Sequence, residues 1–209
     1  MVSKNINIYC VLKQPTSVYT IDYVKMLEKG VTDNTPDNIK ANFFCLSNYP
    51  NATTKLKYNW PGWWSKMELF RPDIKEDFLY MDLDTVIYSN LEEMYNMCFS
   101  NPFPIMIAPF HTAIGSGVMW LPEKYRGIIW NKWIKNPEYW MKRYRGDQDF
   151  IAAILKPMIL LFQDIKPNSV VSFKLHCKDK VPDNAMIICY HGKPKPHETN
   201  WATTSGDFI

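Results

Sequence analysis

The chain has 209 residues, of which 46% are hydrophobic and 22% charged, and its formal net charge is +3. Such a chain can bury a substantial core, so the composition excludes a disordered protein and predicts a single domain over residues 1–209. The net charge is too small to indicate nucleic-acid binding by itself.

The apolar residues lie in short runs, which indicate a soluble protein. No run approaches the roughly 18 apolar residues of a membrane-spanning helix, and the N-terminus lacks the apolar region of a signal peptide. We therefore expect a cytoplasmic protein. The cysteines form no CxxC pair, so we expect reduced and mostly buried thiols at Cys10, Cys45, Cys98, Cys177 and Cys189.

Seven short segments, rich in β-branched and aromatic residues, predict strands. They are residues 6–12, 42–46, 78–81, 104–108, 117–121, 170–175 and 186–190. Several are apolar without alternation, which is typical of strands that are covered on both faces.

Residues 17–30 predict the first helix, because their apolar side chains repeat at helical spacing. Val18, Ile21, Val24 and Leu27 fall on one stripe, and Gly30 is expected to end the helix.

Two later segments have the features of helix starts. Ser89 and Glu92 have the spacing of a capping box, and the carboxylate of Asp147 can cap a helix that begins there. Strands that alternate with helices predict an α/β sandwich with a mostly parallel central sheet flanked by helices. In such sheets, ligands bind beyond the carboxyl ends of the strands.

The apolar strand 78–81 ends in two aspartates, Asp82 and Asp84, separated by one leucine. Residues two apart in an extended chain point to the same side, so both carboxylates can project together. They repel each other unless a positive group lies between them, and Mg²⁺ or Mn²⁺ accepts one or two carboxylates beside phosphate oxygens. A solvated acidic loop is the simpler alternative.

The same residues also fit a second kind of chemistry, that of a phosphatase with a nucleophilic aspartate. Haloacid-dehalogenase-like phosphatases have a nucleophilic aspartate after an apolar strand and an acidic residue two positions later, which would make Asp82 the nucleophile. That nucleophile usually follows the first strand of its domain, whereas two predicted strands and a helix precede Asp82.

Two other segments place polar residues among apolar ones. Lys66 lies on a short predicted helix whose Trp63, Trp64, Met67 and Phe70 are expected in the core. An isolated lysine there is often a snorkelling side chain. In residues 113–121, glycines on both sides of Ser116 allow either a bulge or a close approach to a ligand.

The last predicted strand is followed directly by His191, Gly192 and Lys193. A second lysine, Lys195, lies between two prolines. Imidazole beside carboxylates favours Mn²⁺ over Mg²⁺, and lysines supply charge for phosphate. A solvated tail stiffened by proline is the alternative. Asp147, Gln148 and Asp149 crowd three polar side chains at a helix start, more than capping requires.

The ordered motifs YMDLDTVI, GSGVMWL, GDQDFI and YHGKPKPHE resemble those of GT-A nucleotide-sugar glycosyltransferases, in particular the glycogenin and galactosyltransferase-like family eight and its short bacterial and phage relatives. The resemblance extends over nearly the whole chain and implies a GT-A, Rossmann-like sandwich. It assigns about residues 1–100 to the donor nucleotide and about 101–209 to the acceptor and the metal-binding C-terminal strand.

The resemblance implies that Asp82, Asp84 and His191 coordinate Mn²⁺, or Mg²⁺, which bridges a nucleoside diphosphate. Gly192 and Lys193 would lie against that diphosphate.

Four further residues match donor contacts of the family. Lys66 matches a basic helix residue, Tyr19 an aromatic residue that stacks on uracil, and Ser116 and Gly117 a strand beside the donor sugar. Gly115 replaces the asparagine that precedes this pair in the family.

Asp147 and Gln148 match an Asp-Gln pair near the transferred sugar, and Asp149 replaces a frequent glycine. The expected activity is transfer of a hexose from a UDP-sugar, with retention, to an unidentified acceptor: a glycan, a small molecule, a protein or a modified nucleobase. The alternatives are the dehalogenase-like phosphatase and a nucleotide-sugar-binding protein without activity.

Overall fold

A mixed sheet forms the centre of the computed structural model, which describes residues 4–16, 18–50, 52–108 and 114–199. Within these residues the sheet has seven strands in the order β3-β2-β1-β4-β7-β6-β8. The strands are β1 (Lys4–Leu12), β2 (Ile39–Ser47), β3 (Thr54–Lys55), β4 (Phe78–Met81), β6 (Ile105–Ile107), β7 (Gly115–Leu121) and β8 (Leu160–Leu161).

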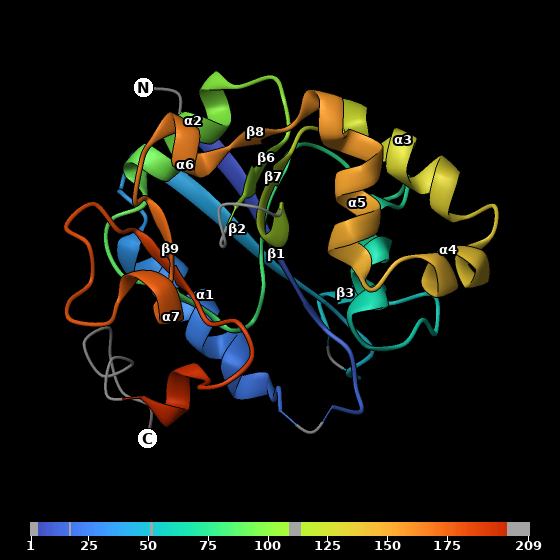
Figure 1. Cartoon of the computed structure of the whole chain (residues 1–209), viewed down its shortest axis with the longest axis horizontal. Coiled ribbons are helices and arrows are strands. Elements are labelled where there is room, and N and C mark those ends of the chain that lie inside the picture. The colour runs from blue at the N-terminus through green and yellow to red at the C-terminus, as the bar shows by residue number, and fades with distance from the viewer. Residues whose placement is uncertain (1–3, 17, 51, 109–113, 200–209) are drawn as a thin grey trace.

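Strand β7 runs antiparallel to both of its neighbours, β4 and β6, whereas the other adjacent pairs in this sheet are parallel. Helices cover both faces, so the predicted α/β sandwich with a mostly parallel sheet is confirmed (Figure 1). All four residues of β4 are buried, as expected for a strand covered on two sides.

The alternation of side chains along β4 divides the core into two layers. Leu79 and Met81 pack in one hydrophobic cluster with helices α1 (Ile21–Asn34) and α2 (Glu92–Ser100). Phe78 and Tyr80 pack in the other with α3 (Glu123–Trp133), α5 (Asp147–Leu155) and the 3₁₀ helix η1 (Gly62–Phe70). Figure 1 shows α1 and α3–α5 on opposite sides of the sheet.

A smaller sheet follows the main one, in the order β5-β10-β9. Its strands are β5 (Thr85–Ile87), β9 (Val170–Ser172) and β10 (Ile187–Cys189). The remaining helical elements are α4 (Pro137–Arg143), η2 (Lys156–Met158), α6 (Phe162–Ile165), α7 (Phe173–His176) and η3 (Pro196–Glu198). The short η3 lies directly after the His191–Lys195 segment.

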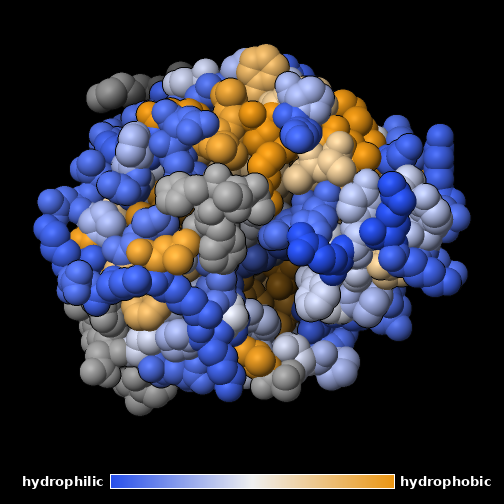
Figure 2. Space-filling view, in the orientation of Figure 1, coloured by the Kyte–Doolittle hydropathy of each residue, from blue (hydrophilic) through white to orange (hydrophobic). Residues whose placement is uncertain are grey.

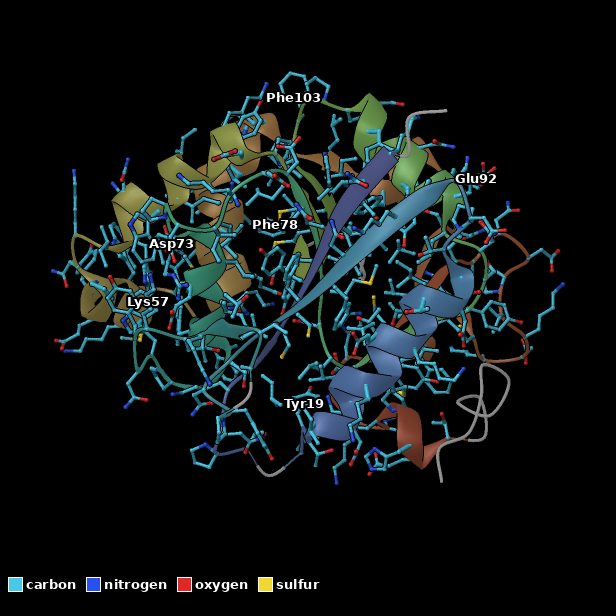
Figure 3. All side chains as sticks on the ribbon, turned by 180° about the vertical axis from the view of Figure 1, so that it is seen from behind. Tyr19, Lys57, Asp73, Phe78, Glu92 and Phe103 are labelled. Atoms are coloured by element: carbon cyan, nitrogen blue, oxygen red, sulfur yellow. The ribbon has the colours of Figure 1, made fainter. Side chains whose placement is uncertain are left out.

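The first helix differs from its predicted bounds at both ends. Thr20 caps it by accepting a hydrogen bond from the backbone N–H of Asp22, so Val18 lies before the helix and is exposed. The helix continues past Gly30, where an added Cβ would lie 3.2 Å from the side chain of Ile87. Gly30 therefore permits close helix–strand packing and does not end the helix. Figure 3 shows Tyr19 just before this helix.

The predicted capping box at Ser89 is wrong. The Ser89 hydroxyl donates to the carbonyl oxygen of Ala185, and α2 begins at Glu92, whose backbone N–H donates to Oδ1 of Asn90 at 2.8 Å. A contact 96 residues away has replaced the local one.

The cysteine prediction is confirmed: all five thiols are free and buried. Among the described residues, none of the helices has both the length and the apolar character needed to cross a membrane.

Candidate active site

A cavity of about 800 Å³ lies at the carboxyl ends of β1 and β4, the edge at which ligands bind in sheets of this kind. Figure 2 shows a hollow near the centre of the face drawn there. Eight of the predicted site residues line the cavity: Tyr19, Lys66, Asp82, Asp84, Ser116, Asp147, Gln148 and Asp149.

The turn between β4 and β5 holds the two aspartates at this edge. The backbone N–H of Asp82 donates to the carbonyl oxygen of Gly117 at 2.7 Å, in the main sheet. The carbonyl oxygen of Asp84 accepts from the N–H of Tyr190 at 3.0 Å, beside the smaller sheet. Both sheets therefore fix the turn, and Leu83 is buried between the two acids.

Lys66 connects Asp82 to the start of α5. Its Nζ lies 3.0 Å from Oδ1 of Asp82 and 3.0 Å from Oδ2 of Asp147, and it donates to Oγ of Ser116 at 3.0 Å. The Ser116 hydroxyl donates to Asp147, and the Tyr80 hydroxyl donates to Asp82 at 2.6 Å. We call these five residues the Lys66 cluster.

Asp147 takes a different role from the predicted one. It is the first residue of α5, while Gly146 occupies the cap position. Its carboxylate is buried against Lys66 and Ser116. Charge neutralisation in the cluster therefore takes the place of helix capping.

The 3₁₀ geometry of η1 separates its core row from Trp63 and Lys66. With three residues per turn, Trp64, Met67 and Phe70 form one row, and all three are buried in the core as predicted. Trp63 and Lys66 belong to another row, and both line the cavity. The prediction of Trp63 as a core residue is wrong, because its side chain is 61% exposed.

A buried ion pair between Glu68 and Arg71 holds η1 against the segment that precedes it. The buried carboxylate of Glu68 accepts the backbone N–H groups of Lys57 at 2.6 Å and Tyr58 at 2.9 Å, and it pairs with buried Arg71. Arg71 also pairs with Asp73. This network fixes the helix that carries Lys66.

A second lysine holds the other aspartate. Nζ of Lys195 lies 2.5 Å from Oδ2 of Asp84 and 2.6 Å from the hydroxyl of Tyr19, which itself donates to Asp84 at 2.8 Å. We call these three residues the Lys195 cluster. Lys195 is a site residue that the sequence analysis left undecided, because its partners are 111 and 176 residues away.

Burial and charge set the protonation of these groups. Burial lowers the pKa of Lys66, but Asp147 and Asp82 raise it further, so its pKa lies above the ordinary value and the ammonium stays charged. Burial and Asp84 raise the pKa of Tyr19, which keeps its hydroxyl as a donor. Burial lowers the pKa of His191, which favours the neutral imidazole.

The carboxylates have the donor chemistry that a divalent cation needs. The Tyr80 hydroxyl and Lys66 contact Oδ1 of Asp82, and the Tyr19 hydroxyl and Lys195 contact Oδ2 of Asp84. A hard cation would bind through the second oxygen of each carboxylate. The same residues contain no group of three or more His, Cys, Asp or Glu side chains arranged to hold a metal ion. The three-ligand set with His191 stays a prediction.

Four predicted site residues are not among the described residues that line the cavity: Gly117, His191, Gly192 and Lys193. Gly117 lies against Asp82, since an added Cβ would be 3.2 Å from Oδ2 of that residue. Gly192 has a φ of +71°, a conformation that suits glycine, and a Cβ there would lie 3.5 Å from Nζ of Lys174.

The strand order and the position of the cavity define the fold of the GT-A glycosyltransferases. The galactosyltransferase LgtC, solved in complex with donor and acceptor sugar analogues, is similar over 94% of this chain and 91% of its own, with a TM-score of 0.68 and 14% identity. GlyE of Streptococcus pneumoniae TIGR4, a glycosyltransferase, is similar over 97% of this chain, with a TM-score of 0.64 and 13% identity.

The chain spans 60% of the GlyE chain and 47% of the bifunctional glycosyltransferase WbbM, whose TM-score is 0.61 at 11% identity. No family model and no curated protein sequence matches this chain. At these identities the similarity establishes the fold, and the resemblance that the motifs predicted is confirmed at that level.

Proposed function

We propose that the protein is a metal-dependent glycosyltransferase that transfers a hexose from a UDP-sugar to an acceptor hydroxyl with retention of configuration. The observation that carries this proposal is the placement of Asp82 and Asp84 in the cavity of a GT-A fold, beside the Lys66 cluster. The LgtC structure with donor and acceptor sugar analogues supports it.

The charge of the site suits a diphosphate only after a cation is added. Asp82, Asp84 and Asp147 carry three negative charges against the two positive charges of Lys66 and Lys195. A Mn²⁺ or Mg²⁺ ion held by Asp82 and Asp84, with His191 as the third protein ligand, would supply positive charge for the departing diphosphate.

Different residues of the chain would bind different parts of the donor. Tyr19 would stack on uracil, and Gly192 and Lys193 would lie against the diphosphate. Ser116 and Gly117 lie beside Asp82, where the donor sugar would follow. Residues 1–100 would hold mainly the nucleotide, and residues 101–209 the acceptor side.

Gln148 would face the transferred sugar, and Asp149 would lie next to it on the acceptor side. The Asp147 carboxylate is held by Lys66 and Ser116, so it positions the start of α5. Asp149 pairs with Arg145 at 2.9 Å, whereas Gln148 follows Asp147 into the cavity. A glutamine that supports the sugar suits retention. One LgtC structure is of an active-site variant in which glutamine is replaced by glutamate.

The test is the variant Asp84→Asn, assayed with UDP-glucose and UDP-galactose in the presence of Mn²⁺. Loss of the metal-binding carboxylate should lower UDP release by about 10²–10³-fold, because charge stabilisation in the transition state is removed. It should also abolish Mn²⁺-dependent UDP binding in calorimetry. The exposed Asp33, changed to asparagine, is the matched control and should change neither.

Three results would contradict the proposal. Full activity of Asp84→Asn would remove the metal assignment. A phosphoryl group trapped on Asp82 would establish the dehalogenase-like phosphatase. Mn²⁺-dependent UDP binding by the unchanged protein, without cleavage of any UDP-sugar, would establish a binding protein without activity.

A further inference from the structure

Trp63 is the most exposed large hydrophobic residue of the described chain, in a segment whose other tryptophans are buried. Trp60 is 9% and Trp64 6% exposed, against 61% for Trp63. A single exposed apolar side chain on an open surface needs no explanation. Trp63, however, forms part of the wall of the cavity, one turn of η1 before Lys66.

Gly146 approaches the Trp63 ring closely on one side. Gly146 lies against it, since an added Cβ at that glycine would be 3.4 Å from Nε1 of the indole. Gly62, directly before it, has a φ of +50°, so the chain enters η1 in a conformation that suits glycine. An indole has few rotatable bonds, so it loses little conformational entropy when a ligand stacks on it.

The contacts place Trp63 at one end of a row of site residues. Trp63 adjoins Gly146, the next residue Asp147 adjoins Lys66, and Lys66 adjoins Asp82. Asp84 and its partner Tyr19 continue the row at the other end. If the nucleotide lies towards Tyr19, Trp63 lies beyond the transferred sugar, where an acceptor must enter.

Polar groups accompany the indole at this end. Arg145 and Asp149 form an ion pair at 2.9 Å, and both line the cavity with Trp63. The Arg145 side chain is 90% exposed, so its guanidinium has donors left for a ligand. Carboxylate and guanidinium groups bind pairs of neighbouring hydroxyls, and the flat apolar face of an indole binds the C–H face of a pyranose ring.

We propose that Trp63, Arg145 and Asp149 form an acceptor subsite that takes a saccharide ring, which stacks on the indole. This inference rests on the proposed function. In the transfer, the bond from the anomeric carbon to the diphosphate oxygen breaks and a bond to the acceptor oxygen forms. The acceptor proton leaves with UDP.

The first experiment compares Trp63→Ala and Trp63→Phe with the unchanged protein, using UDP-glucose and UDP-galactose with a panel of methyl glycosides and disaccharides. Trp63→Ala should raise the acceptor KM by about tenfold or more, because the stacking surface is lost. The acceptor KM of Trp63→Phe should lie between those of the unchanged protein and Trp63→Ala. The donor KM is measured with the same variants, and it should rise less than the acceptor KM if the lost contact is one to the acceptor.

The matched control is Tyr139→Ala on α4. Its side chain is 48% exposed and is not among the cavity-lining residues described. It should leave the acceptor KM unchanged. Equal acceptor KM values for Trp63→Ala and the unchanged protein would overturn the subsite. So would transfer to a peptide or a nucleoside but to no saccharide.

A binding experiment separates failure of this inference from failure of the proposed function. The chain has eight tryptophans. In the ¹H–¹⁵N NMR spectrum, the indole N–H signal that is missing from Trp63→Phe is the signal of Trp63. The same saccharides should shift this signal, with and without UDP and Mn²⁺. A shift in a protein that cleaves no UDP-sugar keeps the saccharide site and rejects the transferase. Cleavage of UDP-sugar without any shift keeps the transferase and rejects the saccharide site.

Discussion

Lys66 and Lys195 hold the two aspartates of the same turn, but they reach them from different parts of the molecule. Lys66 extends from η1, whose buried row packs in the core and whose underside is held by the Glu68–Arg71 pair. Lys195 follows the last strand, on a segment of which Pro196–Glu198 forms the short η3. One lysine belongs to a packed element and the other to the end of the described chain.

The number of anionic partners also differs. Lys66 separates two carboxylates, those of Asp82 and Asp147, whereas Lys195 has one, that of Asp84. If Lys66 is replaced by an uncharged residue, the carboxylates of Asp82 and Asp147 remain close together without that cation. If Lys195 leaves, the Tyr19 hydroxyl still donates to Asp84. We infer that the Lys66 cluster is a fixed part of the fold and that the ammonium of Lys195 can be exchanged for another cation.

The largest expected effect is that of Lys66→Met. The free energy of unfolding should fall by about 3–5 kcal/mol, because the buried carboxylate of Asp147 loses its only described cation. Urea denaturation measures this loss. The second change Asp147→Asn, added to Lys66→Met, should recover part of it and provides a test if the single variant does not fold.

Lys25→Met is the control, because that lysine is 70% exposed on α1 and should cost little. A loss of less than about 1 kcal/mol in Lys66→Met would show that the Lys66 cluster does not support the fold.

Lys195→Met should lower the stability less than Lys66→Met does, and it should strengthen metal binding. The unfolding free energy should fall by about 1–2 kcal/mol, since Asp84 keeps its hydrogen bond from Tyr19. Mn²⁺ should bind about tenfold more tightly without nucleotide, because a competing positive charge has been removed from Asp84. Calorimetric titration with Mn²⁺ measures this affinity.

The exposed Lys180, changed to methionine, is the control and should alter neither quantity. Equal stability losses in Lys66→Met and Lys195→Met would erase the distinction between the two clusters. Unchanged or weaker Mn²⁺ binding in Lys195→Met would show that the ammonium does not compete with the ion.

The sequence was enough to predict the strand that ends in the two aspartates, but not the short β5 that follows them. An apolar run that ends in two acids can be read from neighbouring residues, and burial on both faces of β4 follows from its unbroken apolar character. The order of the motifs was enough to predict the fold.

The partners of the aspartates could not be predicted in the same way. Lys195 reaches Asp84 across 111 residues, and its local surroundings resemble those of a solvated tail. Trp63 was misassigned because a short apolar run does not reveal whether its period is 3.6 or 3.0 residues. In the 3₁₀ form, Trp63 and Lys66 lie one turn apart, and both line the cavity.

The smallest expected effect concerns acid and the support beneath Lys66. Burial raises the pKa of Asp73, but hydrogen bonds from Arg71 and Lys57 outweigh it and lower this pKa from 3.8 to about 2. Figure 3 labels Lys57 and Asp73, whose charged groups lie 2.7 Å apart. A lowered pKa in the folded state gives stability that is complete above the unfolded pKa. This stability is then lost as the pH falls from about 4 towards 2.

Asp73→Asn removes this titration, so its stability relative to the unchanged protein should improve as the pH falls from 5 to 2. The difference should stay below about 1 kcal/mol, because Asp73 is 46% exposed and solvent screens its charge. Urea denaturation at several pH values measures it, with Asp183→Asn as the exposed control. A difference that does not change with pH would mean that Asp73 does not contribute to the support of η1.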